Sequence, residues 1–368
     1  MPVDLATTVE PPVSTQTATP ELPGARCKLG AVSRERTKLR ARSALVGFVA
    51  LAGTYMVTAW VSITLVFLIP RLMPGNPLLA LDDPTSGLYL PSGLDRAHLL
   101  ADYGLDRPLG DQYLSFLHGL VTGNLGYSIT ENIRVSTLIA QSLPWTLLLF
   151  ATALTISAAV SFTTGLASGW RRGGHGDRTS MIGASILHAM PAFVLGTLLL
   201  MAFGVVFPVL PVSGATSAFS SATGFAAALD IARHLVLPAG TLALSLMAGQ
   251  WLLVRGFTVS ALGEDWLLFA RAKGLPESLQ RRRHVGRNAL LPFVTLIGLE
   301  ASFGVGATIF IDSVFSYPGL GALMLQSVDN RDYPVMDACF LVMTAMVLLC
   351  NFVIDMWYLV RVPGARRR

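Results

Sequence analysis

The sequence predicts an all-α, multi-pass membrane protein with six transmembrane helices, and three observations support this fold class. Of the 368 residues, 52% are hydrophobic and 13% are charged, whereas soluble domains average about 25% charged residues. Six apolar stretches are each long enough to cross about 30 Å of hydrocarbon as a helix. Lys and Arg gather in alternate connecting segments, as the positive-inside rule describes. These features argue against a water-soluble enzyme.

Residues 1–43 are predicted to form a disordered N-terminal tail with a basic end. Residues 1–24 are rich in Thr, Pro, Val and Ala and contain no Lys or Arg, a composition typical of disorder. Seven Lys or Arg residues follow between Arg26 and Arg42. The first apolar stretch, residues 44–69, is too long and too late for the apolar region of a cleaved signal peptide. We therefore expect it to remain as a membrane anchor.

Five further spans complete the predicted transmembrane domain, residues 44–360. With the N-terminus in the cytoplasm, the inner segments hold 21 of the 27 Lys and Arg residues, so both ends of the chain are expected in the cytoplasm. Residues 361–368 then form a basic cytoplasmic C-terminus. The five spans are expected at about 145–169, 181–207, 235–254, 293–311 and 338–360.

The outer segment, residues 70–144, is too long to be a simple connector. Its start, from Arg71 to Pro77, contains prolines and a glycine that end a helix and favour a turn. A short amphipathic helix is predicted from Gln112 to Val121, because apolar residues recur there at helical spacing. Its apolar face either packs on the ends of this chain's own spans or docks an external partner.

The inner segment, residues 255–292, contains a second short helix outside the membrane. Glu264 and Asp265 are acids of the kind that favour a helix N-terminus, and Gly274 followed by Pro276 ends the helix. The segment therefore predicts a short helix from Glu264 to Lys273.

One face of this inner helix carries an apolar patch. Trp266, Phe269 and Ala270 follow the i, i+3, i+4 spacing of a single helix face. Such a patch is small enough to enter a groove on a partner protein. The alternative is a basic loop that satisfies the sidedness rule and binds anionic lipid.

Several strings in the sequence resemble one family of transport proteins. Ala-Arg-Ala-Lys-Gly-Leu at 270–275, followed by Arg-Asn-Ala-Leu-Leu-Pro at 287–292, resembles the cytoplasmic EAA loop of ABC importer permeases. The closest likeness is to the first permease of the dipeptide, oligopeptide and nickel branch, which commonly lacks the glutamate of that motif, as this chain does. Together the strings extend the resemblance over about residues 44–358. The others are Gly-Leu-Asp-Arg-Pro-Leu at 104–109, Gly-Asn-Leu-Gly-Tyr-Ser at 123–128, Val-Phe-Ser-Tyr-Pro-Gly-Leu-Gly at 314–321 and Asn-Arg-Asp-Tyr-Pro at 330–334.

This resemblance implies a type I ABC importer permease of a bacterial plasma (inner) membrane that forms half of a pathway for peptides. The implied partners are a second homologous permease, two ATP-binding cassette ATPases, an extracytoplasmic substrate-binding protein and membrane lipid, but no nucleic acid. Nickel or glutathione import by the same branch stays open. The chain has no GxxxxGK[ST] string, so ATP and Mg are expected on the ATPases. We expect no catalytic residue, cofactor or metal in this chain.

Two functions outside this family are alternatives to this interpretation. A stand-alone secondary transporter would need coupling acids that face each other in inverted repeats, and the sequence offers only Glu300. A membrane enzyme would need a motif such as HExxH or GxSxG, and neither is present.

The resemblance also makes the helix from Glu264 to Lys273 a coupling helix, through which the ATPases move the spans. Gly274 would allow close approach of the ATPase surface, and Ala270 a tight fit in its groove. The expected coupling residues are Glu264, Asp265, Trp266, Phe269, Ala270, Arg271, Ala272, Lys273 and Gly274.

A polar stripe is expected in the fifth span. Glu300, Gly304, Thr308 and Asp312 recur every four residues and share one side of a helix. An ionised carboxylate at mid-bilayer costs about 3 kcal/mol on insertion scales, so Glu300 should face protein or water. We expect the stripe to line the translocation pathway, with Glu300 available to an ammonium group. The alternative is a Glu300 that is protonated or hydrogen-bonded to a neighbouring helix.

The third span contains a helix-breaking proline. Pro191 removes one backbone donor near the middle of that span, so we expect a bend there. The neighbouring His188 is interpreted as a packing residue, because no other ligand type accompanies it at metal-ligand spacing.

Overall fold

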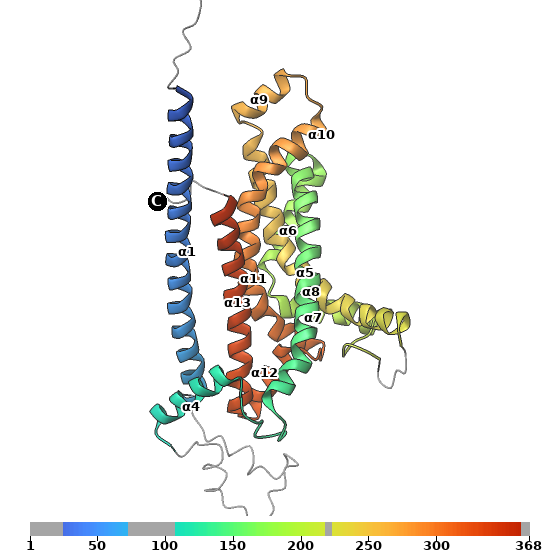
Figure 1. Ribbon diagram of the computed structural model, residues 1–368. Helices are drawn as coiled ribbons and strands as arrows, with labels where there is room; N and C mark the ends of the chain where they lie inside the picture. The colour runs from blue at the N-terminus through green and yellow to red at the C-terminus, as the bar shows by residue number, and fades with distance from the viewer. Residues whose placement is uncertain (1–24, 73–106, 218–222, 362–368) are drawn as a thin grey trace, which may run out of the picture. The chain divides into compact units, whose positions relative to one another are not determined.

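The computed structural model describes residues 25–72, 107–217 and 223–361 of the chain (Figure 1). Over these residues all regular secondary structure is helical, apart from one isolated antiparallel bridge between Tyr127 and Arg134. The predicted all-α fold class is therefore confirmed. Four expectations lie wholly or partly outside the described residues: the tail up to residue 24, the turn at 73–77, the start of the 104–109 string, and residues 362–368.

The chain divides into two units, Met1–Gly53 and Thr54–Arg368, with the boundary inside helix α1 (Ala25–Leu72). Helix α1 begins at Ala25, so it includes residues 25–43, which we expected to belong to a disordered tail. The physical reason is composition, because most of this stretch is Ala, Leu, Arg, Lys and Glu, which are strong helix formers. The helix therefore starts before the first apolar stretch rather than with it.

Five helices are long and apolar enough to cross a membrane, and a bent pair of helices makes a sixth candidate span. Most of these helices are longer than their apolar stretch; α5, for example, begins at Val135 rather than near Trp145. The five candidates are Phe48–Leu72 within α1, α5 (Val135–Trp170), α8 (Phe225–Ala261), Glu277–Val314 with α11 (Gly286–Val314), and Tyr333–Trp357 within α13 (Tyr333–Arg361).

The third expected span is not one continuous helix. It consists of α6 (His175–Ala189) and α7 (Ala192–Leu200), and a π-helical turn η1 (Met201–Val206) continues α7. The two parts are bent by 106° at the break. Met190 is extended there, as the residue before a proline usually is, and Pro191 has no N–H to continue the ladder. The bend at Pro191 is thus a full break of the helix.

Shorter helices connect the spans of the second unit. Figure 1 shows α9 and α10 at one end of the bundle formed by α5, α8, α11 and α13, with α4 and α12 at the other end. Helix α12, which begins within the 314–321 string, was not predicted from the sequence. The short elements are α4 (Leu109–Thr122), α9 (Asp265–Ala272), α10 (Glu277–Leu279), the π-helical turn η2 (Gln280–Val285) and α12 (Leu320–Asp329).

Helices α5 and α8 form the most closely packed pair of the bundle. A Cβ atom added to Gly169 of α5 would lie 2.6 Å from the Cβ of Thr258 and 2.8 Å from the carbonyl oxygen of Arg255 in α8. Gly165, one turn earlier, is almost as close to Trp251. Small residues at this spacing let two helix backbones approach directly. The two helices therefore act as a rigid support for the segments that follow α8.

Candidate functional site

The inner loop forms the short helix α9, with Glu264 in extended conformation just before it. At its other end Gly274 has a left-handed φ of +68°, which favours glycine. The N–H of Gly274 donates to the carbonyl of Arg271 at 2.9 Å, and that of Leu275 donates to Ala270 at 3.3 Å. These two hydrogen bonds form a Schellman motif, which ends a helix sharply.

The two faces of α9 have different surroundings. Leu267 and Ala270 are only 0% and 4% exposed, whereas Leu268 is 51% and Phe269 70% exposed. The inner face packs in an apolar cluster that joins α5, α8, η2 and α11, and Trp266 lies at its edge. The buried members of that cluster are Leu166, Val254, Ala261, Leu267, Ala270, Val285 and Phe293.

This packing corrects the expected apolar patch. Ala270 cannot enter a groove of a partner protein, because it is already buried against its own chain. The exposed apolar surface of α9 consists instead of Leu268 and Phe269. The remaining expected coupling residues are exposed, namely Glu264, Asp265, Arg271, Ala272, Lys273 and Gly274.

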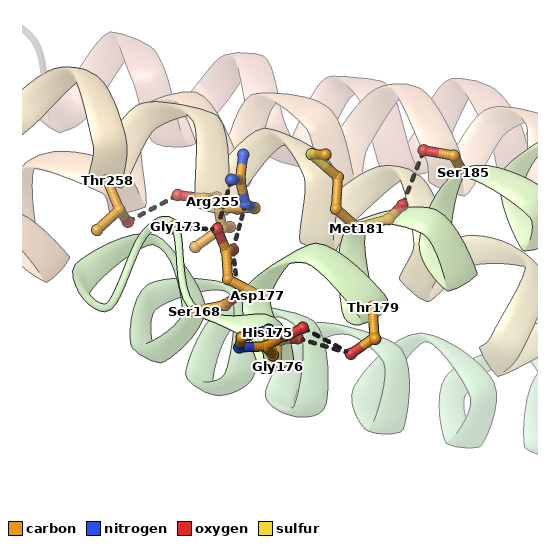
Figure 2. Close-up of polar contacts among 11 residues, drawn as sticks. Ser168, Gly173, His175, Gly176, Asp177, Thr179, Met181, Ser185, Arg255 and Thr258 are labelled. Carbon is orange, nitrogen blue, oxygen red and sulfur yellow. Dashed lines mark hydrogen bonds and ion pairs between the residues drawn. The ribbon is translucent and has the colours of Figure 1, made fainter.

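A buried ion pair lies close to this loop, between α6 and α8 (Figure 2). The Arg255 guanidinium donates from Nε and Nη2 to the two carboxylate oxygens of Asp177, at 2.6 and 2.8 Å. Ser168 Oγ and the N–H of Gly173 also donate to Asp177, at 2.7 and 3.0 Å. We call these four residues the α6–α8 clamp. Sequence reasoning missed it, although opposite charges near the inner ends of successive spans were a signal.

A second polar cluster lies within the spans, around Glu300 of α11. Gln250 of α8 donates from Nε2 to Glu300 Oε2 at 2.6 Å and to Ser157 Oγ at 3.3 Å. Ser161 of α5 donates in turn to Gln250 Oε1 at 2.8 Å. Gln250 is fully buried, whereas Glu300 is only partly buried. Glu300 is thus hydrogen-bonded to a neighbouring helix and still has accessible surface.

The second oxygen of Glu300 faces Gly249 of α8. A Cβ atom added to Gly249 would lie 3.1 Å from Glu300 Oε1 and 3.1 Å from Cε1 of His188. His188 is exposed overall, but its ring lies against Gly249, which is a packing contact of the kind expected for it. Among the described residues, Glu300 Oε1 accepts no hydrogen bond. A group placed beside Gly249 would therefore contact both a carboxylate oxygen and an imidazole.

The rest of the expected stripe points into the bundle. Thr308 and Asp312 are fully buried, and Gly304 lies against the ring of Phe150. The regular spacing does put these residues on one helix face, but that face packs on α5 and α12. Only Glu300 of the stripe has accessible surface, so the other three residues do not line an open pathway in this chain.

Asp312 organises the start of α12 instead. Its Oδ2 accepts a hydrogen bond from the N–H of Gly321 at 3.0 Å, in the first turn of that helix, where a carboxylate is favourable. A Cβ atom on Gly321 would lie 2.5 Å from the Cα of Ile309. Burial, with Asp312 nearby, raises the pKa of Tyr317 to about 12, so that phenol stays protonated. The 314–321 string is therefore a packing motif in this structure.

Polar contacts join two other family-like strings at the end of the bundle that carries α4 and α12. Asp332 Oδ2 accepts hydrogen bonds from Ser128 Oγ at 2.5 Å and from Thr130 Oγ1 at 3.0 Å. Asp337 pairs with Arg71 of α1 at 2.9 Å. The start of α13 is thus attached both to Ser128 and Thr130 of the outer segment and to Arg71 of α1.

Helix α4 is the expected amphipathic helix, and only part of its surface packs on this chain's own spans. Tyr113 lies within hydrogen-bond distance of Thr64, at 2.8 Å, and its ring packs against Phe67 of α1. Leu114 and Val121, on the same helix, remain exposed. One side of α4 thus packs on this chain's own span, and the other side stays free within the described residues.

Known proteins resemble this chain over most of its length. Residues 161–367 match the family described as binding-protein-dependent transport system inner membrane component. A putative peptide permease protein of Brucella ovis is 38% identical over 300 residues, covering 81% of this chain and 92% of the relative. A glutathione transport system permease protein of Pectobacterium atrosepticum is 34% identical, covering 84% and 95%. The dipeptide transport system permease protein of Escherichia coli K12 is 31% identical, covering 85% and 96%.

Proposed function

The chain belongs to the inner membrane components of binding-protein-dependent transport systems, and from this premise we propose that it imports peptides as one permease of an ATP-driven complex. A member of this family is a multi-pass permease subunit and not itself an enzyme. Transport in such a system depends on a binding protein and on ATPase subunits. We infer a complex of this chain with a second homologous permease, two ATPases and an extracytoplasmic binding protein.

The observation that supports this proposal most directly is the two-sided packing of α9. Its inner face is buried against α5, α8 and α11, so a displacement of α9 displaces those helices. Its outer face presents Leu268 and Phe269, which would lose water-exposed apolar surface in a partner's groove. We propose that these two side chains dock into an ATPase subunit, with Arg271 and Lys273 beside them. Gly274 leaves room for the ATPase surface next to the end of the helix.

The proposed orientation places α9 in the cytoplasm. It rests on the distribution of Lys and Arg, most of which fall in the segments that share a side with α9. Both chain ends are then cytoplasmic, and α4 and α12 lie on the outer side, where a binding protein would approach.

Within the membrane, we propose that Glu300 contributes to the peptide pathway. Gln250 holds one carboxylate oxygen, and the other oxygen faces the space beside Gly249 and His188. A carboxylate oriented in this way suits the terminal ammonium of a peptide or a cationic side chain.

The substrate is proposed from the relatives. Two of the three relatives described above carry peptide or dipeptide permease in their names. The third carries glutathione, which is itself a peptide derivative. We therefore propose short peptides as the substrate class, with glutathione as the compound to be tested beside them.

Reconstitution tests the whole proposal. Proteoliposomes that contain both permeases and both ATPases should take up labelled di- to tetrapeptides only when ATP and the binding protein are present. Glutathione, included in the same panel, identifies the narrower substrate. Uptake by this chain alone would instead support a stand-alone transporter, and a complex that never forms with the ATPases would contradict the proposal.

Two variants test the proposed residues. Phe269→Ser should abolish ATPase binding and uptake while the chain still folds. Phe225→Ser, at another exposed phenylalanine, the first residue of α8, should leave ATPase binding intact. Glu300→Gln should slow uptake of cationic peptides more than that of neutral ones. Equal rates for both peptide types in an assembled Glu300→Gln complex would remove Glu300 from substrate recognition.

A further inference from the structure

Helix α6 is attached to the rest of the chain in an unusual way. Asp177 is its one buried residue, and the apolar side chains Ile182 and Ile186 on the same helix are exposed. Helices of a packed bundle usually bury an apolar stripe against their neighbours. No apolar side chain of α6 is fully buried within the described chain, although Met181, Ala184 and Leu187 on one face are partly buried. The one fully buried link between α6 and its neighbours is therefore polar, and it is the α6–α8 clamp.

The clamp has the geometry of a strong, specific link. The Asp177 carboxylate accepts four hydrogen bonds, two from the guanidinium of Arg255 and one each from Ser168 and Gly173. The side chains of Asp177 and Arg255 are 4% and 19% exposed, respectively. A bidentate, charge-assisted pair holds direction as well as distance. Separation of this pair would leave a buried charge without its partner, so the clamp favours movement of its two helices together.

The α8 side of the clamp is continuous with the support of α9. Arg255 follows Val254, which is fully buried in the apolar cluster beneath α9, and Ala261 of the same cluster ends α8. Only residues 262–264 separate α8 from α9. A displacement of α9 is thus transferred to α8 by tight packing, and from α8 to α6 by the clamp.

The far end of α6 lies at the break of the bent span. The helix stops at Ala189, just before Pro191, and His188 in its last turn faces Gly249 beside Glu300. A tilt of α6 pivoting at this break would change the space between His188 and Glu300.

We propose that the α6–α8 clamp transmits the movement of α9 to the bent α6–α7 span. Asp177 and Arg255 are then positioning residues for transport, and this inference rests on the function proposed above. In the working complex the ion pair of the clamp stays intact. When the ATPases move α9, α6 therefore tilts together with α8.

The test measures coupling rather than activity alone. Complexes of the full chain with its partner permease, ATPases and binding protein are reconstituted, and peptide uptake is divided by ATP hydrolysed in the same vesicles. The peptide is the one that the unaltered complex takes up fastest from the panel above. Asp177→Asn and Arg255→Lys should lower this ratio by roughly fivefold or more, the lower range of coupling between linked sites. Arg178→Gln removes the exposed cation next to Asp177 and should leave the ratio unchanged.

A double variant separates transmission from simple folding. Asp177→Asn combined with Arg255→Gln removes both buried charges, so the complex should assemble better than Asp177→Asn alone, which leaves Arg255 unpaired, while the ratio stays low. If the double variant regains the ratio of the unaltered complex, or if Asp177→Asn alone keeps it, the inference is overturned. If the unaltered complex shows no ATP-dependent uptake, the proposed function has failed instead.

Discussion

Helices α6 and α8 pack against each other, yet the fold holds them by opposite means. Fifteen residues of α8 are buried, most of them apolar or small, whereas Asp177 is the one buried residue of α6. Helix α8 therefore belongs to a packed body with α5, α9 and α11. Helix α6 has only partly buried apolar side chains, at Met181, Ala184 and Leu187. Its specific contacts are the Asp177 salt bridge near one end and His188 against Gly249 at the other. A helix held by polar contacts can change its angle without unpacking the core, because close-packed interiors resist gradual deformation.

The largest effect is expected where the packed body meets the coupling helix. Leu267→Ala removes a fully buried side chain beneath α9, and leucine-to-alanine changes in cores cost about 3 kcal/mol. Thermal unfolding of the purified chain in detergent measures this cost. Leu268→Ala, at the exposed neighbour, should change stability by less than about 0.5 kcal/mol and should weaken ATPase binding instead. Equal stability of the two variants would show that α9 is not packed on the body.

A second test concerns the contact between α5 and α8. Gly169→Ala would place a methyl group 2.8 Å from a backbone oxygen of α8, so the helices must separate, at a cost of about 2 kcal/mol for overpacking. Gly183→Ala in α6, where a Cβ atom meets nothing within 4 Å, should not destabilise the chain. The same unfolding assay compares both variants. If Gly183→Ala lowered the stability as much as Gly169→Ala, α6 would be packed as tightly as the α5–α8 pair, and the distinction drawn above would be wrong.

A third test addresses the polar interior of the packed body. Gln250→Leu keeps the size of the side chain but removes the donor to Glu300 and the acceptor for Ser161. An unsatisfied buried partner costs about 1.5 kcal/mol. Ser185→Ala removes a hydroxyl of α6 that bonds only to its own helix, at Met181, and should cost less than about 0.5 kcal/mol. If Gln250→Leu is neutral in the unfolding assay, the network does not stabilise the bundle.

Local signals explain which parts of the molecule could be predicted from sequence. Helix α9 lies within one residue of its predicted start and end, because the acids at its start and the residues Gly274 and Pro276 at its end act within a turn. The apolar stretches likewise locate the helices, since the cost of burying polar groups in lipid acts on each span separately. The fold class therefore followed from composition and periodicity.

Which face of each helix is buried could not be predicted in the same way. Ala270 is buried in an apolar cluster that includes Val254 and Phe293, and nothing in the spacing of α9 identifies those neighbours. The same holds for Thr308 and Asp312, whose shared face turns out to pack on other helices. Asp177 and Arg255 are 78 residues apart in the sequence, so their pairing depends entirely on how α6 packs on α8.

The smallest effect on stability is expected at Gly249 of α8, where the end of α6 meets the packed body. This position also tests whether the contact between α6 and the packed body serves transport. A methyl group there would lie 3.1 Å from Glu300 Oε1 and from His188 Cε1. Both atoms are near the ends of side chains that can move aside, so Gly249→Ala should change stability by less than about 0.5 kcal/mol. The methyl group would nevertheless fill the space proposed for the peptide's ammonium. Uptake of cationic peptides should therefore fall by roughly threefold while ATPase binding is unchanged, since half a kilocalorie or so is lost from one charge-assisted contact.

Gly240→Ala, on the same helix with no neighbour within 4 Å, serves as the control. A Gly249→Ala complex that transports like the control would place the peptide elsewhere and would leave His188 as a contact that only positions α6.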